Sequence, residues 1–121
     1  MTNDRRYLSG NDFLKEILPP YEERDFSGIV LEEGFDLSGN KRFKELQVYF
    51  RKEQSRGALQ KSPVILNRAE LKGLKSGWLF LPYLEGEGIK LVNCDFADAY
   101  FFHANFCSAS FDDCDFSRGN L

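Results

Sequence analysis

The chain has 121 residues, 42% of them hydrophobic, and a formal net charge of −3. This length predicts one domain with a single core, and the weak net charge excludes a strongly basic nucleic-acid-binding protein. No apolar run approaches the roughly 18 residues of a membrane-spanning helix, so we expect no membrane association. Because the net charge is weak, we also expect no direct binding of nucleic acid.

The N-terminal sequence MTNDRRYLSG lacks the apolar segment of a secretory signal, and we expect residues 1–10 to be loosely ordered. The three cysteines are an odd number without disulfide-scaffold spacing, which fits a reducing compartment. Together these features predict a cytoplasmic protein.

A short helix is predicted at residues 11–18, where one apolar stripe is formed by Phe13, Leu14, Ile17 and Leu18. Asn11 is the expected N-cap, and Pro19 and Pro20 end the helix because proline disfavours helical geometry in the residue before it. Residues 22–39 contain the similar segments RDFSG, IVLEE and FDLSG, with a slip of one residue between Leu31 and Leu37.

Residues 40–62 return to a helical pattern, with Asn40 as the expected cap, Gly57 as the expected end and a shared apolar face at Phe43, Leu46, Tyr49 and Phe50. The segment is also basic, with Lys41, Arg42, Lys44, Arg51, Lys52 and Arg56. A basic helix of this kind either binds nucleic acid or lies across the protein's own acidic side.

From Val64 to Leu121 the sequence has a period of five, which neither an α-helix nor a plain strand has. The last repeats are centred on Phe96, Phe101, Phe106, Phe111, Phe116 and Leu121. A small residue stands two positions before each of these centres. The same register continues backwards through Leu91, Gly86, Leu81, Ser76, Leu71 and Leu66.

The windows CDFAD, ANFCS and CDFSR resemble the pentapeptide-repeat family. The resemblance implies an all-β fold, a right-handed quadrilateral β-helix in which each coil takes four pentapeptides and the centres point inward. We therefore expect one pentapeptide-repeat domain over 1–121, with a short N-terminal helix (11–18), a partial first coil (22–39), one inserted helix (40–62) and regular coils (64–121). Residue n then stacks against residue n+20, and the five Phe centres are all buried.

In this register one outward face gathers the side chains of Trp78, Phe80, Tyr83, Tyr100, Phe102 and His103. An exposed aromatic surface of this kind marks a contact surface. It is covered either by the protein's own helices or by another molecule. We expect the helix at 40–62 to dock on this face or over the N-terminal open end of the solenoid.

A candidate acidic patch is formed by Asp95, Asp112, Asp113 and Asp115. Like charges that are this close repel, so the patch is either solvated surface or a site for a basic partner. The C-terminal coil, with Phe106, Phe111, Phe116 and Leu121, has no layer or cap above it in the sequence. Such an edge predicts a homodimer joined at this end, or a continuation that the chain lacks.

No arrangement of residues in the sequence predicts a catalytic, metal or phosphate-binding site. The residue types of a zinc site are present in Cys94, His103, Cys107 and Cys114, but the register points them in different directions, so we expect no metal or other cofactor. The single His has no nucleophile partner, and GEG at 86–88 is too short for a phosphate-binding loop. We predict a non-enzymatic binding or scaffold module with a protein partner. The alternative is a DNA-mimic inhibitor or protector of a type II topoisomerase (gyrase), as some relatives are.

Overall fold

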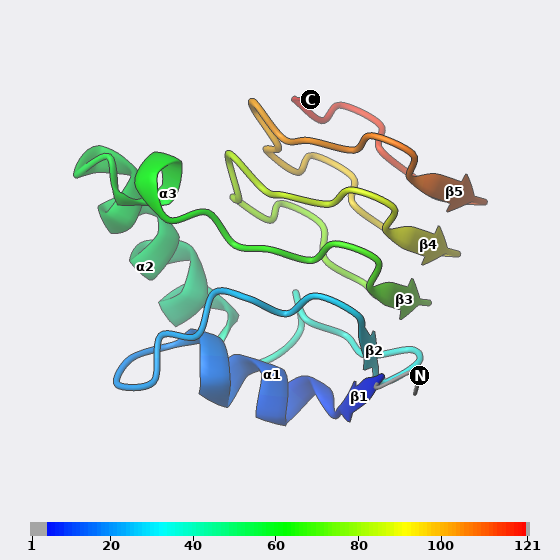
Figure 1. Ribbon diagram of the computed structural model, residues 1–121, viewed down its shortest axis with the longest axis horizontal. Helices are drawn as coiled ribbons and strands as arrows, with labels where there is room; N and C mark the ends of the chain where they lie inside the picture. The colour runs from blue at the N-terminus through cyan, green and yellow to red at the C-terminus, as the bar shows by residue number, and fades with distance from the viewer. Residues whose placement is uncertain (1–4, 121) are drawn as a thin grey trace.

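The computed structural model describes residues 5–120, which contain one sheet of five parallel strands. The strands are short and neighbour one another in chain order: β1 (Arg6–Leu8), β2 (Ile29–Leu31), β3 (Glu70–Lys72), β4 (Lys90–Val92) and β5 (Ser110–Asp112). The sheet is open and forms one side of a stack of coils, whose successive layers lie above one another in Figure 1.

The stacking repeats every twenty residues, as the resemblance to pentapeptide repeats implies. Leu91 of β4 pairs with Leu71 of β3 below and with Phe111 of β5 above. Isolated parallel bridges repeat this spacing on the other sides of the coil, for example between Phe80 and Tyr100. Each inner coil therefore satisfies its backbone by hydrogen bonds to the coils above and below.

The partial first coil keeps this pairing until the predicted slip. Asp25 pairs with Ile65 and Val30 with Glu70, but Asp36 pairs with Lys75, one residue out of the earlier register. The slip therefore lies between β2 and Asp36, where the sequence places it. On the fourth side of this coil, the insertion replaces the strand that would lie beneath Phe80.

The N-terminal end is more ordered than the sequence predicts. The expectation of loose structure is wrong for residues 6–8, which form β1 alongside β2, while residues 1–4 lie outside the described range. Leu8 is buried, and Arg5 forms an ion pair with Glu70 at 2.7 Å, so β1 is held at both its ends. This strand covers the edge of β2 that would otherwise be open to other chains.

The helix α1 (Gly10–Ile17) lies beneath the first coil in Figure 1. Its N-cap is Ser9, whose hydroxyl accepts a hydrogen bond from the amide of Asp12, so the assignment of Asn11 as the cap is wrong. Its apolar stripe is buried as predicted, with Leu14 and Ile17 at 1% exposure or less. Together with β1, this helix closes the N-terminal end of the core.

The insertion contains two helices rather than one: α2 (Phe43–Ser55) and α3 (Ala58–Lys61). Gly57 between them takes a left-handed conformation at φ 72°, which ends α2 and turns the chain. The N-cap of α2 is Arg42, without a side-chain cap bond, so the assignment of Asn40 as the cap is wrong; the Asn40 oxygen accepts from the Arg42 amide before the helix begins. Both helices lie on the side of the stack opposite the sheet (Figure 1). No helix in the described range has the length and hydrophobicity needed to cross a membrane.

The core follows the repeat centres, but its C-terminal end is open. Phe96 and Phe101 are buried at 3% and 2% exposure, whereas Phe106 and Phe116 are half-buried and Phe111 is 48% exposed. The prediction that all five rings are buried is therefore wrong for the last coil. The rings still point inward and stack, as Phe96 and Phe116 do at 5.6 Å between centroids, but no described residue lies above them.

Candidate contact surface

The six residues of the aromatic face (Trp78, Phe80, Tyr83, Tyr100, Phe102 and His103) lie on two consecutive coils. Phe80 stacks on Tyr100 with ring centroids 4.9 Å apart, and Tyr83 stacks on His103 at 5.1 Å. Phe102 joins the two pairs, at 5.9 Å from Tyr100 and 4.0 Å from His103. The solenoid spacing thus places five of the six rings in one connected layer.

Trp78 lies at the corner where this face begins and is not part of those ring pairs. It is 68% exposed, and Phe102 is 41% exposed. The rings of Phe80, Tyr83 and Tyr100 are half-buried. The aromatic face therefore offers its largest apolar areas to solvent at these two residues.

The backbone at the corners is left-handed. Trp78 has a φ of 69°, and Tyr83 and His103 have 64° and 61°. This conformation costs a side chain with a Cβ about 1–2 kcal/mol and is least unfavourable for Gly, Asn and Asp. Elsewhere in the solenoid the same corner position is held both by such residues, for example Gly73, Gly88, Asn93 and Asp98, and by Arg68, Ser108 and Arg118. Trp78 carries this cost without the burial that would offset it.

One edge of the aromatic face is bordered by α2 through Gln47. The side-chain amide of Gln47 donates to the carbonyl oxygen of Trp78 at 2.6 Å, and its oxygen accepts from the amide of Phe80 at 2.9 Å. The carboxamide thus makes the two bonds that a residue of a neighbouring strand would make. It replaces the missing strand on this side of the first coil.

A second residue of α2 contacts the face directly. The guanidinium carbon of Arg51 lies 4.4 Å from the centroid of the Phe80 ring, within cation–π range. The protein's own helix therefore covers the Phe80 edge of the aromatic face and leaves Trp78 and Phe102 open. Sequence reasoning missed Gln47 and named Arg51 only as one of the basic residues of the helix, because a polar residue on a helix carries no signal of what it will contact.

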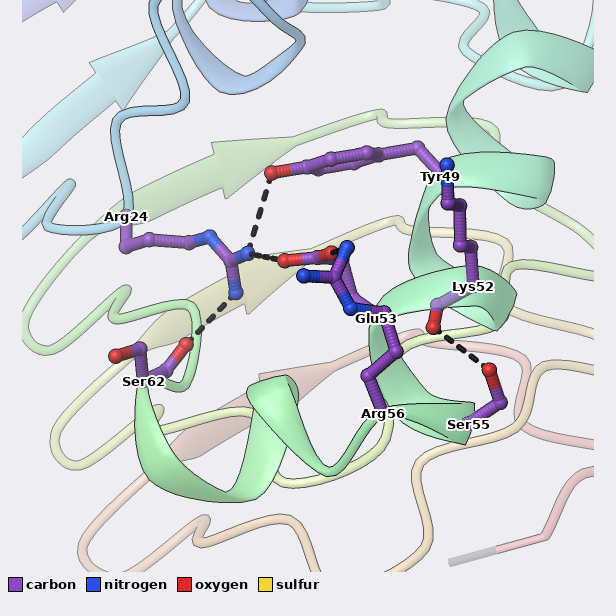
Figure 2. A network of polar contacts seen from close by, with 7 residues as sticks. All are labelled: Arg24, Tyr49, Lys52, Glu53, Ser55, Arg56 and Ser62. Atoms are coloured by element: carbon purple, nitrogen blue, oxygen red, sulfur yellow. Dashed lines mark hydrogen bonds and ion pairs between the residues drawn. The ribbon is translucent and has the colours of Figure 1, made fainter.

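A partly buried network fastens α2 and α3 to the first coil (Figure 2). Arg24 donates to Glu53 at 2.6 Å, to the Tyr49 hydroxyl at 3.1 Å and to the carbonyl oxygen of Ser62 at 2.7 Å. The side chains of Arg24 and Glu53 are only 17% and 14% exposed. Burial is the main cause that raises the pKa of Tyr49, against the opposing hydrogen bond from Arg24. The position of α2 beside the aromatic face is thus set by several charge-assisted bonds.

The acidic patch is spread along the surface rather than gathered into one site. Asp95 pairs with Asp115 one coil above, and Asp112 ends β5 with Asp113 directly after it. Asp115 accepts bonds from Ser117, which lower its pKa, and Asp95 accepts from the amide of Ala97. No group of three or more potential metal ligands comes together within the described residues. The carboxylates of Asp95 and Asp115 each order their own turn.

The last described coil leaves an open hollow of about 350 Å³ lined by Phe106, Phe111, Asp113, Cys114 and Phe116. One coil below, the amides of Gly86, Gly88 and Phe96 donate to the coil above them. The corresponding amides at Phe106, Ser108 and Phe116 have no acceptor among the described residues. Leu121, the fourth residue predicted for this end, lies outside the described range.

The comparison with protein families agrees with this geometry. The model for pentapeptide repeats matches residues 87–121 with 8 copies. Residues 87–121 therefore carry pentapeptide repeats, which imply a β-helix solenoid. No curated protein matches the chain. No solved structure matches it either.

Proposed function

We propose that the protein is a non-enzymatic binding module of the cytoplasm, built as a right-handed quadrilateral β-helix, and that the aromatic face is its contact surface for another protein. The observation that carries the proposal is Trp78. A large indole stands 68% exposed in a left-handed conformation that Asn or Gly would adopt at lower cost. Exposed Arg68 shares this conformation, so what distinguishes Trp78 is its large apolar ring, and such a ring left open to solvent marks a contact surface.

The residues around Trp78 support the same role. Phe102 adds a second exposed ring, and the stacked pairs behind it hold the surface rigid. A rigid aromatic surface loses little conformational entropy on binding, which is why Trp and Tyr dominate the energetics of protein interfaces.

The test compares Trp78→Asn with Arg68→Asn. Arg68 occupies the same corner position on another face, with a φ of 60°, and is also exposed. Both variants should unfold at the same or higher urea concentration than the wild type, because Asn tolerates the left-handed region. Cross-linking in a lysate of the native host should then show proteins that the wild type and Arg68→Asn retain and Trp78→Asn loses. Equal capture by both variants would exclude the aromatic face as the contact surface.

A second interface is proposed at the C-terminal coil, where two copies join end to end as a homodimer. The hollow lined by three Phe rings supports it, as do the rim amides that have no acceptor among the described residues, since such an edge invites pairing with another chain. Sedimentation across a concentration range should show dimers that Phe116→Lys abolishes. A wild type that remains monomeric at high micromolar concentration would contradict this interface.

The DNA-mimic role is less well supported than a protein-binding module. It needs a continuous column of negative charge, but Lys75 lies below Asp95 in the stack, and Arg118 pairs with Asp98 at 3.0 Å. We therefore expect purified protein to leave the supercoiling activity of gyrase unchanged. Inhibition or protection at stoichiometric concentration would favour the topoisomerase role instead.

A further inference from the structure

The open part of the aromatic face is bordered by a positively charged helix surface. On α2, Glu45 is paired with Arg42, and Glu53 is paired with Arg24 and Arg56. No described carboxylate lies within ion-pair distance of the three remaining cations of this helix, Lys44, Arg51 and Lys52. The acidic groups of α2 are thus neutralised internally, and its exposed charge is positive.

The same helix surface also carries an exposed apolar residue. Val48 is 59% exposed and lies three residues before Arg51, so the two side chains are neighbours on the helix. Gln47, directly before Val48, contacts Trp78 and Phe80. Exposed apolar side chains therefore lie on α2, at Val48, and on the solenoid, at Trp78 and Phe102. The cations of α2 lie on the helix side of this surface.

We propose that α2 and the aromatic face together form a docking site for an acidic peptide segment with apolar side chains, carried by a partner protein. Its apolar side chains lie on Trp78 and Phe102, and its carboxylates lie against Lys44, Arg51 and Lys52. The proposal rests on the function proposed above and specifies the chemistry of the partner.

Charge distinguishes this occupant from nucleic acid. A long polyanion would extend beyond α2 to the side of the solenoid that carries Asp95 and Asp115, on a chain of net charge −3. A short acidic segment needs to contact only the basic helix and the rings beside it. Electrostatic complementarity of this kind sets which partner is accepted and how fast it associates.

Trp78 is the only tryptophan in the chain, so its fluorescence reports on this site directly. The probes are a short peptide of Asp, Glu, Leu and Phe, the same peptide with Lys in place of its acids, and single-stranded oligothymidine. The acidic peptide should shift the Trp78 emission to shorter wavelength in a saturable way, and added salt should weaken its binding. Arg51→Glu should weaken it by about tenfold or more, whereas Lys61→Glu on α3 should leave it unchanged.

Other outcomes overturn the proposal. Equal binding of the Lys peptide removes the role of charge, and tighter binding of oligothymidine assigns the site to nucleic acid. A shift that depends on protein concentration alone assigns the face to a second copy, and no shift with any probe leaves no docking site of this chemistry. If Phe102→Ala still reduces capture of host proteins while Arg51→Glu does not, the proposed function stands and the acidic partner is wrong.

Discussion

Gln47 holds α2 in the place of a missing strand, and its removal should destabilise the protein measurably. Its side chain makes two hydrogen bonds to solenoid backbone, at 2.6 Å and 2.9 Å. Each is expected to contribute about 0.5–1.5 kcal/mol, so Gln47→Met should lower the free energy of unfolding by roughly 1–3 kcal/mol. Methionine keeps the length and helix propensity of the side chain, which isolates the polar contribution.

The assay is urea unfolding, with amide hydrogen exchange at Phe80 as a local readout. Gln60→Met on α3 is the matched control, because Gln60 is an exposed helical residue that does not contact the Trp78–Phe80 backbone. The Phe80 amide should exchange faster in Gln47→Met and at the wild-type rate in Gln60→Met. A difference between the two variants below about 0.5 kcal/mol, with Phe80 still protected, would refute the view that the carboxamide replaces a strand.

The stability lost when a repeat-centre Phe is replaced by Ala should decrease towards the C-terminal end of the stack. Phe101→Ala, at 2% exposure, should cost about 3–5 kcal/mol, whereas Phe111→Ala, at 48% exposure, should cost about 1–1.5 kcal/mol in the same urea assay; equal costs would mean that the last coil is covered in solution. Burial raises the pKa of Cys94 to about 11, so iodoacetamide at pH 8 should modify exposed Cys107 and spare Cys94. Because this pKa is raised on folding, the stabilisation from the neutral Cys94 thiol is complete below about pH 8.5 and is lost as the pH rises through about 11. Cys94→Ala should remove that part of the alkaline loss of stability, and an unchanged alkaline profile would contradict it.

The register of the solenoid could be predicted from the sequence because one residue type recurs at a fixed interval. Phe96, Phe101 and Leu91 are buried where the period of five places them. The one-residue slip before Leu37 could also be predicted, because the repeat spacing changes there. Periodicity reports which side chains point inward, and inward side chains make up the core.

The features that the sequence did not predict depend on contacts between segments far apart in the chain. β1 forms because Leu8 and Arg5 find partners in later coils, although RRYLSG shows no strand pattern. Gln47 reaches backbone more than thirty residues away, at Phe80. Phe111 holds the same repeat position as Leu91 one coil below, yet Phe111 is exposed because a repeat centre is buried only when another layer lies above it.

The central claim, that Trp78 is open to solvent and available for contact, is tested most directly by collisional quenching of its fluorescence in the free protein. The 68% exposure of Trp78 predicts an emission close to that of a hydrated indole and efficient quenching by both iodide and acrylamide. Because Arg51 lies beside the face, iodide should be attracted rather than repelled, and Arg51→Glu should reduce quenching by iodide more than quenching by acrylamide. A blue-shifted emission that neither quencher reaches would show that the aromatic face is already covered and would contradict the account.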